Sequence, residues 1–268
     1  MIELIGGIEV EGRLRRDVTL KPLTGAAEMA LAELARTDLT SPDKVTRFLM
    51  ETVADVGGAP ADPAALSVGD RQYLVRQIGV GLGVDRLWLG GDCPTCGEPF
   101  EIEVSQGDLP VKRAGADYPA ATLALGDAEC AIRTPTGADQ SAIADLPPDA
   151  AAQALLRRLV SAPDDMDLTG DTRTALEDAI EDLSPEVALE VAAQCPDCGA
   201  DVRLEVDPYL TLTQSGQDIL DDVHVLARHY HWAEADILSL TRARRHAYLA
   251  RIDQDRGMSA DPHTVEVP

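Results

Sequence analysis

Aromatic and basic residues are scarce in this chain. Two Phe, two Trp and five Tyr occur in 268 residues, so the core must rest on Ala, Leu, Val and Ile rather than on an aromatic platform. The 23 basic residues are outnumbered by 47 acidic ones, which gives a formal charge of −24. Because phosphate backbones attract clustered Lys and Arg, this charge argues against nucleic acid as a partner.

Long apolar runs are also missing. The first residues, Met1 to Gly7, contain neither a basic start nor the apolar stretch of a signal peptide. No window reaches the roughly 18 apolar residues of a membrane-spanning helix. We therefore expect a protein that is cytoplasmic when made and that has no membrane span.

Five cysteines are present, and four of them form two copies of one motif in distant parts of the chain. The copies are Cys93-Pro94-Thr95-Cys96-Gly97 and Cys195-Pro196-Asp197-Cys198-Gly199. In each copy the proline and the glycine favour a tight turn that directs both sulfurs to one ion. Two such turns supply the four thiolates that zinc prefers. The sequence therefore predicts one structural zinc ion held by Cys93, Cys96, Cys195 and Cys198.

Two disulfides or four free thiols are the alternatives to this metal site. The repeated spacing with Pro and Gly is typical of metal sites, and nothing in the sequence indicates secretion. A catalytic zinc is disfavoured because four cysteines leave no coordination position for water. The fifth cysteine, Cys130, is expected to be buried in a strand, since no His lies near it to make it a nucleophile.

The segments 98–104 and 200–206, which follow the two motifs, alternate apolar and charged residues as half-buried strands do. We therefore expect an α+β protein with a zinc ribbon formed by two distant CPxCG knuckles, a mixed insertion between them, and helical N- and C-terminal regions. The expected domains are 1–92 (strands plus helices), 93–107 with 194–207 (the split zinc ribbon), 108–193 (the mixed insertion), 208–258 (C-terminal helices) and 259–268 (a flexible tail).

The remaining elements are predicted from periodicity and from cap residues. A strand pair or one long strand is expected within 8–20, and further strands are expected at 109–111 and 121–133. In the N-terminal region, helices are expected at 26–35, from Ser41 as the cap and after Ser67. In the insertion, they are expected after the turn at 134–140 and at 149–160, 172–182 and 185–193. In the C-terminal region, one helix is expected from Gln217 and a last one carries Ile237 to Ile252. The acidic stretch 161–167 is expected to be a solvated loop.

The C-terminal helical region contains the main concentration of arginine. Arg242, Arg244, Arg245 and Arg251 lie beside an apolar stripe, and Tyr230 and Trp232 precede them. This pattern is typical either of a solvated face or of a surface that binds a partner, and Arg, Tyr and Trp are enriched at interfaces. We expect Arg242, Arg244, Arg245, Tyr230 and Trp232 to contribute to such a surface.

The sequence offers no credible active site, so we expect a protein that is not an enzyme. It contains no Ser-His-Asp order, Walker loop, dinucleotide fingerprint or HExxH motif. His224, His229 and His231 lie close in sequence, but one helix cannot direct all three to one ion, so packing and helix-end roles are expected.

Several stretches together resemble the T4-like baseplate hub assembly proteins of contractile phage tails and contractile injection systems. They are Gly69-Asp70-Arg71-Gln72 ahead of the first knuckle, Arg133-Thr134-Pro135-Thr136-Gly137-Ala138-Asp139, the second knuckle, Leu226-Ala227-Arg228-His229-Tyr230-His231-Trp232, and Arg244-Arg245-His246-Ala247-Tyr248-Leu249.

The resemblance implies a non-enzymatic component of the baseplate hub, or a factor in its assembly, whose partners are other baseplate, hub or spike proteins. Such a protein can join the assembled particle. The alternative is a cytoplasmic zinc-ribbon adaptor in transcription or nucleic-acid processing, which the charge disfavours. A metallohydrolase would need an open zinc or a second metal site.

Overall fold

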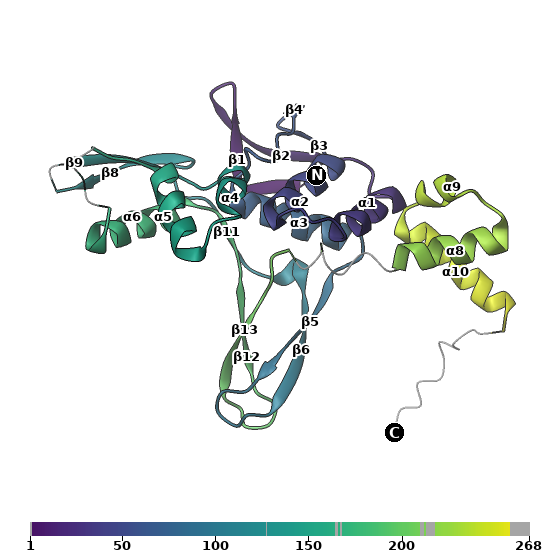
Figure 1. Ribbon diagram of the computed structural model, residues 1–268. Helices are drawn as coiled ribbons and strands as arrows, with labels where there is room; N and C mark the ends of the chain where they lie inside the picture. The colour runs from purple at the N-terminus through teal and green to yellow at the C-terminus, as the bar shows by residue number, and fades with distance from the viewer. Residues whose placement is uncertain are drawn as a thin grey trace.

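The computed structural model describes residues 2–126, 128–163, 166, 168–209, 212 and 218–257. The protein has a mixed α+β fold, as expected. Figure 1 shows four parts. A central body carries an insertion on one side and a group of C-terminal helices on the other. An arm of strands projects from the body between them.

The body contains a four-stranded antiparallel sheet packed against helices. The strands follow the order β1-β2-β3-β4, and the elements of the body are β1 (Ile2–Val10), β2 (Arg13–Leu20), β3 (Val53–Val56), β4 (Ala59–Pro60), α1 (Gly25–Ala35), α2 (Ser41–Thr52) and α3 (Val68–Gly81). Strand side chains such as Leu4 and Val18 pack with Phe48 and Leu74 from the helices, all of them 0–1% exposed. Of the two expectations for 8–20, the strand pair is confirmed, because β1 and β2 pair and the chain turns at Glu11 and Gly12, both with positive φ.

Cap residues explain where the helices of the body begin. The Ser67 side chain accepts a hydrogen bond from the backbone N–H of Asp70, so α3 begins after Ser67 as predicted. The cap of α2 is Thr40 rather than the predicted Ser41, because the Thr40 hydroxyl accepts the hydrogen bond from Asp43 and Ser41 is already helical.

The insertion has its own core and follows the expected order of strands and then helices, with two short exceptions. Its buried residues include Ile132, Leu156 and Leu176. The elements that follow the 3₁₀ turn η1 (Gln106–Asp108) are β7 (Val111–Lys112), β8 (Ala120–Leu125), β9 (Ala128–Arg133), α4 (Gly137–Ile143), α5 (Pro148–Leu159), β10 (Val160–Ser161), α6 (Gly170–Leu183) and β11 (Glu186–Val187). The exceptions to the expected order are the two-residue strands β10 and β11, which come after α5 and α6.

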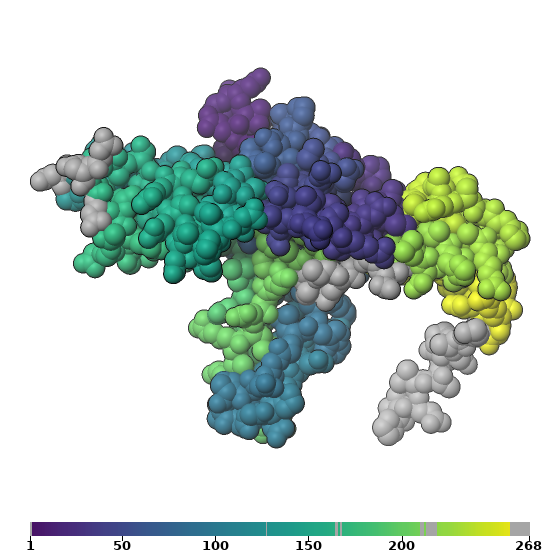
Figure 2. Space-filling model, viewed as in Figure 1, coloured from purple at the N-terminus to yellow at the C-terminus, as the bar shows by residue number. Residues whose placement is uncertain are grey.

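The arm consists of two antiparallel hairpins, one of β5 (Arg86–Asp92) with β6 (Pro99–Ser105) and one of β12 (Glu190–Gln194) with β13 (Asp201–Glu205). The hairpins share a small core that includes Leu87, Phe100 and Leu204. Their turns, which contain the cysteines, form the far end of the arm, and Figure 2 shows this end standing clear of the body. The predicted strands after the knuckles are thus confirmed as β6 and β13.

The predicted helix at 185–193 is wrong, because this segment contains β11 and most of β12 instead. The residues of β12 alternate between exposed and half-buried, and each pairs with a residue of β13. Glu and Ala favour helices in isolation, but here pairing with the neighbouring strand overrides that preference.

The C-terminal region contains α8 (Asp218–Tyr230), α9 (Glu234–Leu238) and α10 (Arg242–Asp255), packed around Leu226, Ile237 and Ile252. The single helix predicted from Ile237 to Ile252 is wrong, because Thr241 has an extended backbone (ψ 155°) that separates α9 from α10. Gln217, the tail 259–268 and Asp164, Asp165 and Asp167 of the acidic stretch lie outside the described residues.

The Gly69-Asp70-Arg71-Gln72 stretch forms the first turn of α3 and joins several segments. Asp70 is 0% exposed, and its carboxylate accepts hydrogen bonds from the backbone N–H groups of Gly6 (2.8 Å) and Gly7 (2.9 Å) in β1. Arg71 is also 0% exposed and donates to the carbonyls of Pro63 and Pro42, at 2.7 Å each. This turn therefore links the sheet, α2 and the loop ahead of α3.

The second stretch of the resemblance, 133–139, meets the first one. Val68 donates its N–H to the Pro135 carbonyl at 3.0 Å. Gly137 packs so closely on Arg71 that a Cβ atom at residue 137 would lie 2.2 Å from the Arg71 guanidinium. Asp139 closes a capping box on α4 and binds Arg133 and Arg158 at 2.6 and 2.9 Å. Two stretches that are distant in sequence therefore form one junction.

Gly69→Ala tests how closely α3 must approach the chain at Pro185. A Cβ atom at residue 69 would lie 1.9 Å from the Pro185 carbonyl oxygen, so α3 and the neighbouring segment would have to separate. We expect a loss of about 1–3 kcal/mol of stability, typical of overpacking. Thermal melting should show it as a fall of roughly 2–4 °C for each kcal/mol.

Gly107→Ala is the matched control. A Cβ atom at residue 107 would make only ordinary contacts, the nearest at 3.4 Å from the Ser105 hydroxyl. Equal melting temperatures for the two variants would contradict the proposed tight contact.

Candidate metal centre

The two cysteine motifs form the turns of the two hairpins in the arm, and their backbones follow the same pattern. In the first turn Gly97 donates its N–H to the Cys93 carbonyl at 2.8 Å, and in the second Gly199 donates to the Cys195 carbonyl at 2.9 Å. Both glycines have a positive φ, 78° and 73°, which favours glycine over other residues. The glycine in each motif is therefore required by the turn.

These turns bring four sulfur atoms together from the two hairpins. The Sγ atoms of Cys93, Cys96, Cys195 and Cys198 all lie within 4.8 Å of one another. Two of the pairs cross between the hairpins, with the sulfur of Cys93 3.6 Å from that of Cys198 and the sulfur of Cys96 3.7 Å from that of Cys195. A disulfide needs about 2.05 Å, and all five cysteines of the chain are free.

The sulfur positions fit a tetrahedral metal ion. Metal–sulfur bonds of about 2.3 Å to zinc place the sulfurs of a regular tetrahedron about 3.8 Å apart, close to the two cross-hairpin distances. Hydrogen bonds from the backbone N–H groups of Cys96 and then Thr95 lower the pKa of Cys93 to about 6. They favour the thiolate of Cys93, which is the form that binds a metal. The pKa values of Cys96 and Cys198 are raised instead, because the backbone hydrogen bonds to them from Glu98 and Ala200, which favour the thiolate, are outweighed by burial and the neighbouring sulfurs.

The burial of the four cysteines is uneven. Cys93 and Cys195 are each 2% exposed and belong to the core of the arm, whereas Cys96 and Cys198 are exposed at its end. The first cysteine of each motif therefore anchors its turn inside the arm, and the second cysteine faces solvent.

The histidines of the C-terminal region do not gather at one point. His224 and His229 are exposed on α8, and His231 lies after the end of that helix with a φ of 56°. Within the described residues, the four cysteines form the only group of three or more His, Cys, Asp or Glu arranged to share a metal ion. Cys130 is buried in β9, as predicted, with its sulfur 3.3 Å from that of Met166.

The structure corrects the expectation for two of the C-terminal arginines. Arg245 is 0% exposed and binds Glu28 of α1 at 2.7 Å and Asp222 of α8 at 3.1 Å. Arg242 donates to the Leu82 carbonyl at 2.9 Å. Neither is free for a partner surface, because both attach the C-terminal helices to the body.

The aromatic residues of the same region are also partly engaged within the chain. Tyr230 and Trp232 stack with ring centroids 4.8 Å apart, and Tyr248 meets both rings edge to face. All three side chains are half-buried, whereas Arg244 and Arg251 are exposed. The surface that remains for a partner here is smaller than the sequence suggested.

The chain matches no family model, no curated protein and no solved structure. Among the helices that the structure describes, none is long and apolar enough to cross a membrane. The four cysteines and their surroundings therefore provide the basis for a functional argument.

Arg245→Met should destabilise the protein strongly. The substitution keeps most of the side-chain volume but leaves Glu28 with only the longer contact to Arg242 (3.8 Å) and Asp222 with only His246 (3.8 Å). Loss of one partner from a buried ionic group costs about 3–5 kcal/mol. Urea denaturation measures the loss. Arg244→Met, one residue earlier and exposed, should change stability by less than about 0.5 kcal/mol. Similar losses for both variants would contradict the anchoring role of Arg245.

Proposed function

We propose that the four cysteines bind one Zn²⁺ ion and that the arm is a zinc ribbon. Tetrahedral sites with four sulfur ligands select zinc or iron, and the matched CPxCG turns favour zinc. Four thiolates would fill the coordination sphere, so the metal would hold the two hairpins together and would leave no position for a substrate or a water nucleophile. The role of the metal is therefore structural.

On this basis the protein serves as a non-enzymatic structural or assembly component of the baseplate hub of a contractile phage tail or contractile injection system. The observation that carries the proposal is the four-sulfur cluster at the end of a projecting arm. Because four thiolates leave no open coordination position, this cluster fits a structural role better than a catalytic one. The assignment to a baseplate hub comes from the sequence resemblance. It is supported by the junction at which the stretches 69–72 and 133–139 of that resemblance meet.

A zinc-ribbon adaptor for nucleic acid is the second candidate, because many ribbons have that role. The charge of the arm argues against binding of nucleic acid. Its exposed basic residues, Arg86 and Arg203, are each paired with a glutamate, Glu103 and Glu190. Further exposed acidic residues on the arm are Asp92, Glu98, Glu101, Asp197, Asp201 and Glu205. Such a surface repels phosphate backbones.

Metal analysis tests the zinc site directly. Purified protein should contain one zinc ion per chain, and Cys195→Ser should lose it and melt at a much lower temperature, because the arm depends on the metal to join its hairpins. Cys130→Ser is the control, since Cys130 lies in the insertion and should leave the zinc content unchanged. A folded, zinc-free protein, bound iron, or a disulfide within either knuckle would refute the assignment.

The proposed role is tested in cells that produce the particle. Deletion of the gene for this chain should abolish complete contractile particles in electron micrographs. The unaltered gene and the Cys130→Ser gene should restore them, whereas Cys195→Ser should not. Genes for sheath, tube and spike proteins beside this gene would support the role independently. Normal particle numbers after the deletion would rule it out.

A DNA-binding measurement separates the two candidates. At physiological salt the purified, zinc-loaded protein should not retain duplex DNA on a filter, because its field is negative. Salt-sensitive binding at micromolar concentration would favour the adaptor.

A further inference from the structure

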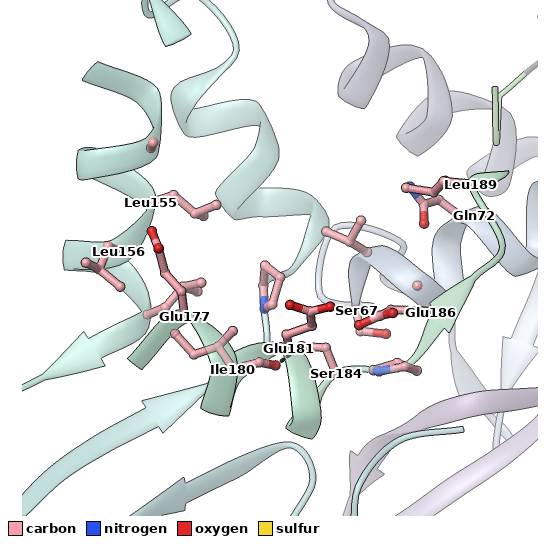
Figure 3. A pocket seen from close by; sticks show the side chains of 16 residues that line it. Ser67, Gln72, Leu155, Leu156, Glu177, Ile180, Glu181, Ser184, Glu186 and Leu189 are labelled. Carbon is pink, nitrogen blue, oxygen red and sulfur yellow. Dashed lines mark hydrogen bonds between the residues drawn. The ribbon is translucent and has the colours of Figure 1, made fainter. Parts of the chain in front are cut away.

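A groove lies where the body meets the insertion, away from the cysteines. It encloses a volume of about 370 Å³, which is within the range of about 300–1,000 Å³ for ligand sites. One wall is the first turn of α3 with Pro135, and the other is made by α5 and α6 (Figure 3). The segment 184–189 lies between these walls.

The lining of the groove is mainly aliphatic. Leu155, Leu156 and Leu159 from α5 meet Ile180 from α6. Leu156, Leu159 and Ile180 belong to the core of the insertion, whereas Leu155 is half-buried. At the other end Leu189 is 49% exposed, one of the few large apolar side chains that the protein leaves open to solvent. The groove can therefore accept apolar side chains without displacing any part of the core.

The charged residues around the groove are all acidic. Glu177, Glu181 and Glu186 line it, and no Lys or Arg does. Arg173 and Lys112, both outside the groove, pair with Glu177 at 2.8 Å and with Glu186 at 3.2 Å. Glu181 is exposed, and its carboxylate has no ion-pair partner among the described residues, although the Lys112 ammonium donates to the Glu181 backbone carbonyl. The rim thus carries three carboxylates beside an apolar floor.

We propose that this groove binds an apolar segment of a partner protein that is flanked by Lys or Arg. The aliphatic floor contributes affinity by burying apolar side chains. The carboxylates select against acidic segments, including those of a second copy of this chain with its charge of −24. The amide of Gln72, which lies in the groove, is able to bond to the partner backbone. This inference rests on the proposed role as an assembly component.

Two synthetic peptides serve as probes of the groove. Both carry leucines at helical spacing, with lysine at the remaining positions of one peptide and glutamate at those of the other. Fluorescence anisotropy with the full-length, zinc-loaded protein should show that the lysine peptide binds at least about tenfold more tightly. Binding should weaken as salt is added.

Matched variants locate the binding. Glu181→Lys should weaken binding of the lysine peptide by about tenfold, whereas Asp182→Lys, with the same charge change on the adjacent exposed residue outside the groove, should weaken it far less. Leu189→Ser should also weaken it, and Leu220→Ser on α8 should not. Melting temperatures and zinc contents equal to those of the parent would confirm that the exposed variants fold.

Three results would overturn the proposal: equal affinity for the two peptides, no binding of either, or binding that the groove variants leave unchanged. The peptide measurement involves neither particles nor DNA. Its failure would therefore leave the assembly role to be decided by the deletion experiment, and a failed deletion experiment would not alter a positive peptide result.

Discussion

The burial of two neighbouring ionisable side chains, Asp70 and Arg71, constrains the whole body of the protein. Burial raises the pKa of Asp70, opposed by hydrogen bonds from Gly6 and Gly7, and it lowers the pKa of Arg71. A buried polar group without partners costs about 1–3 kcal/mol, and a charge costs more. Backbone groups of β1, α2 and the loop at Pro63 hold these side chains, together with the hydroxyls of Ser67 and Thr46. Arg71 Nε alone has no partner among the described residues.

The two cysteine motifs lie on either side of a long segment of the chain. The chain leaves the body through the first hairpin, builds the whole insertion, and returns through the second hairpin before the C-terminal helices. A metal that joins the hairpins therefore closes a loop that contains the insertion. The entropic cost of loop closure increases with loop length, although slowly, so a clip between distant segments removes more of this cost than a clip between near ones.

Sequence patterns correctly predicted the elements that are determined by residues close together in the chain. The cysteine turns, the strands after them, the start of α3 at Ser67 and the buried Cys130 were of this kind. The strand β12 and the break at Thr241 could not be predicted, because pairing with β13 and packing around Ile237 decide them. The internal role of Arg245 depends on Glu28, which is 217 residues away, so composition alone suggested a surface.

The uneven burial of the four cysteines has a consequence for metal exchange. Each hairpin contributes one buried sulfur, from Cys93 or Cys195, and one exposed sulfur, from Cys96 or Cys198. A chelator or a metal carrier that approaches from solvent meets the exposed sulfurs first. It can replace them one at a time while a buried ligand still holds each hairpin. A metal bound at the proposed site would then exchange in steps at the end of the arm, without separation of its two halves.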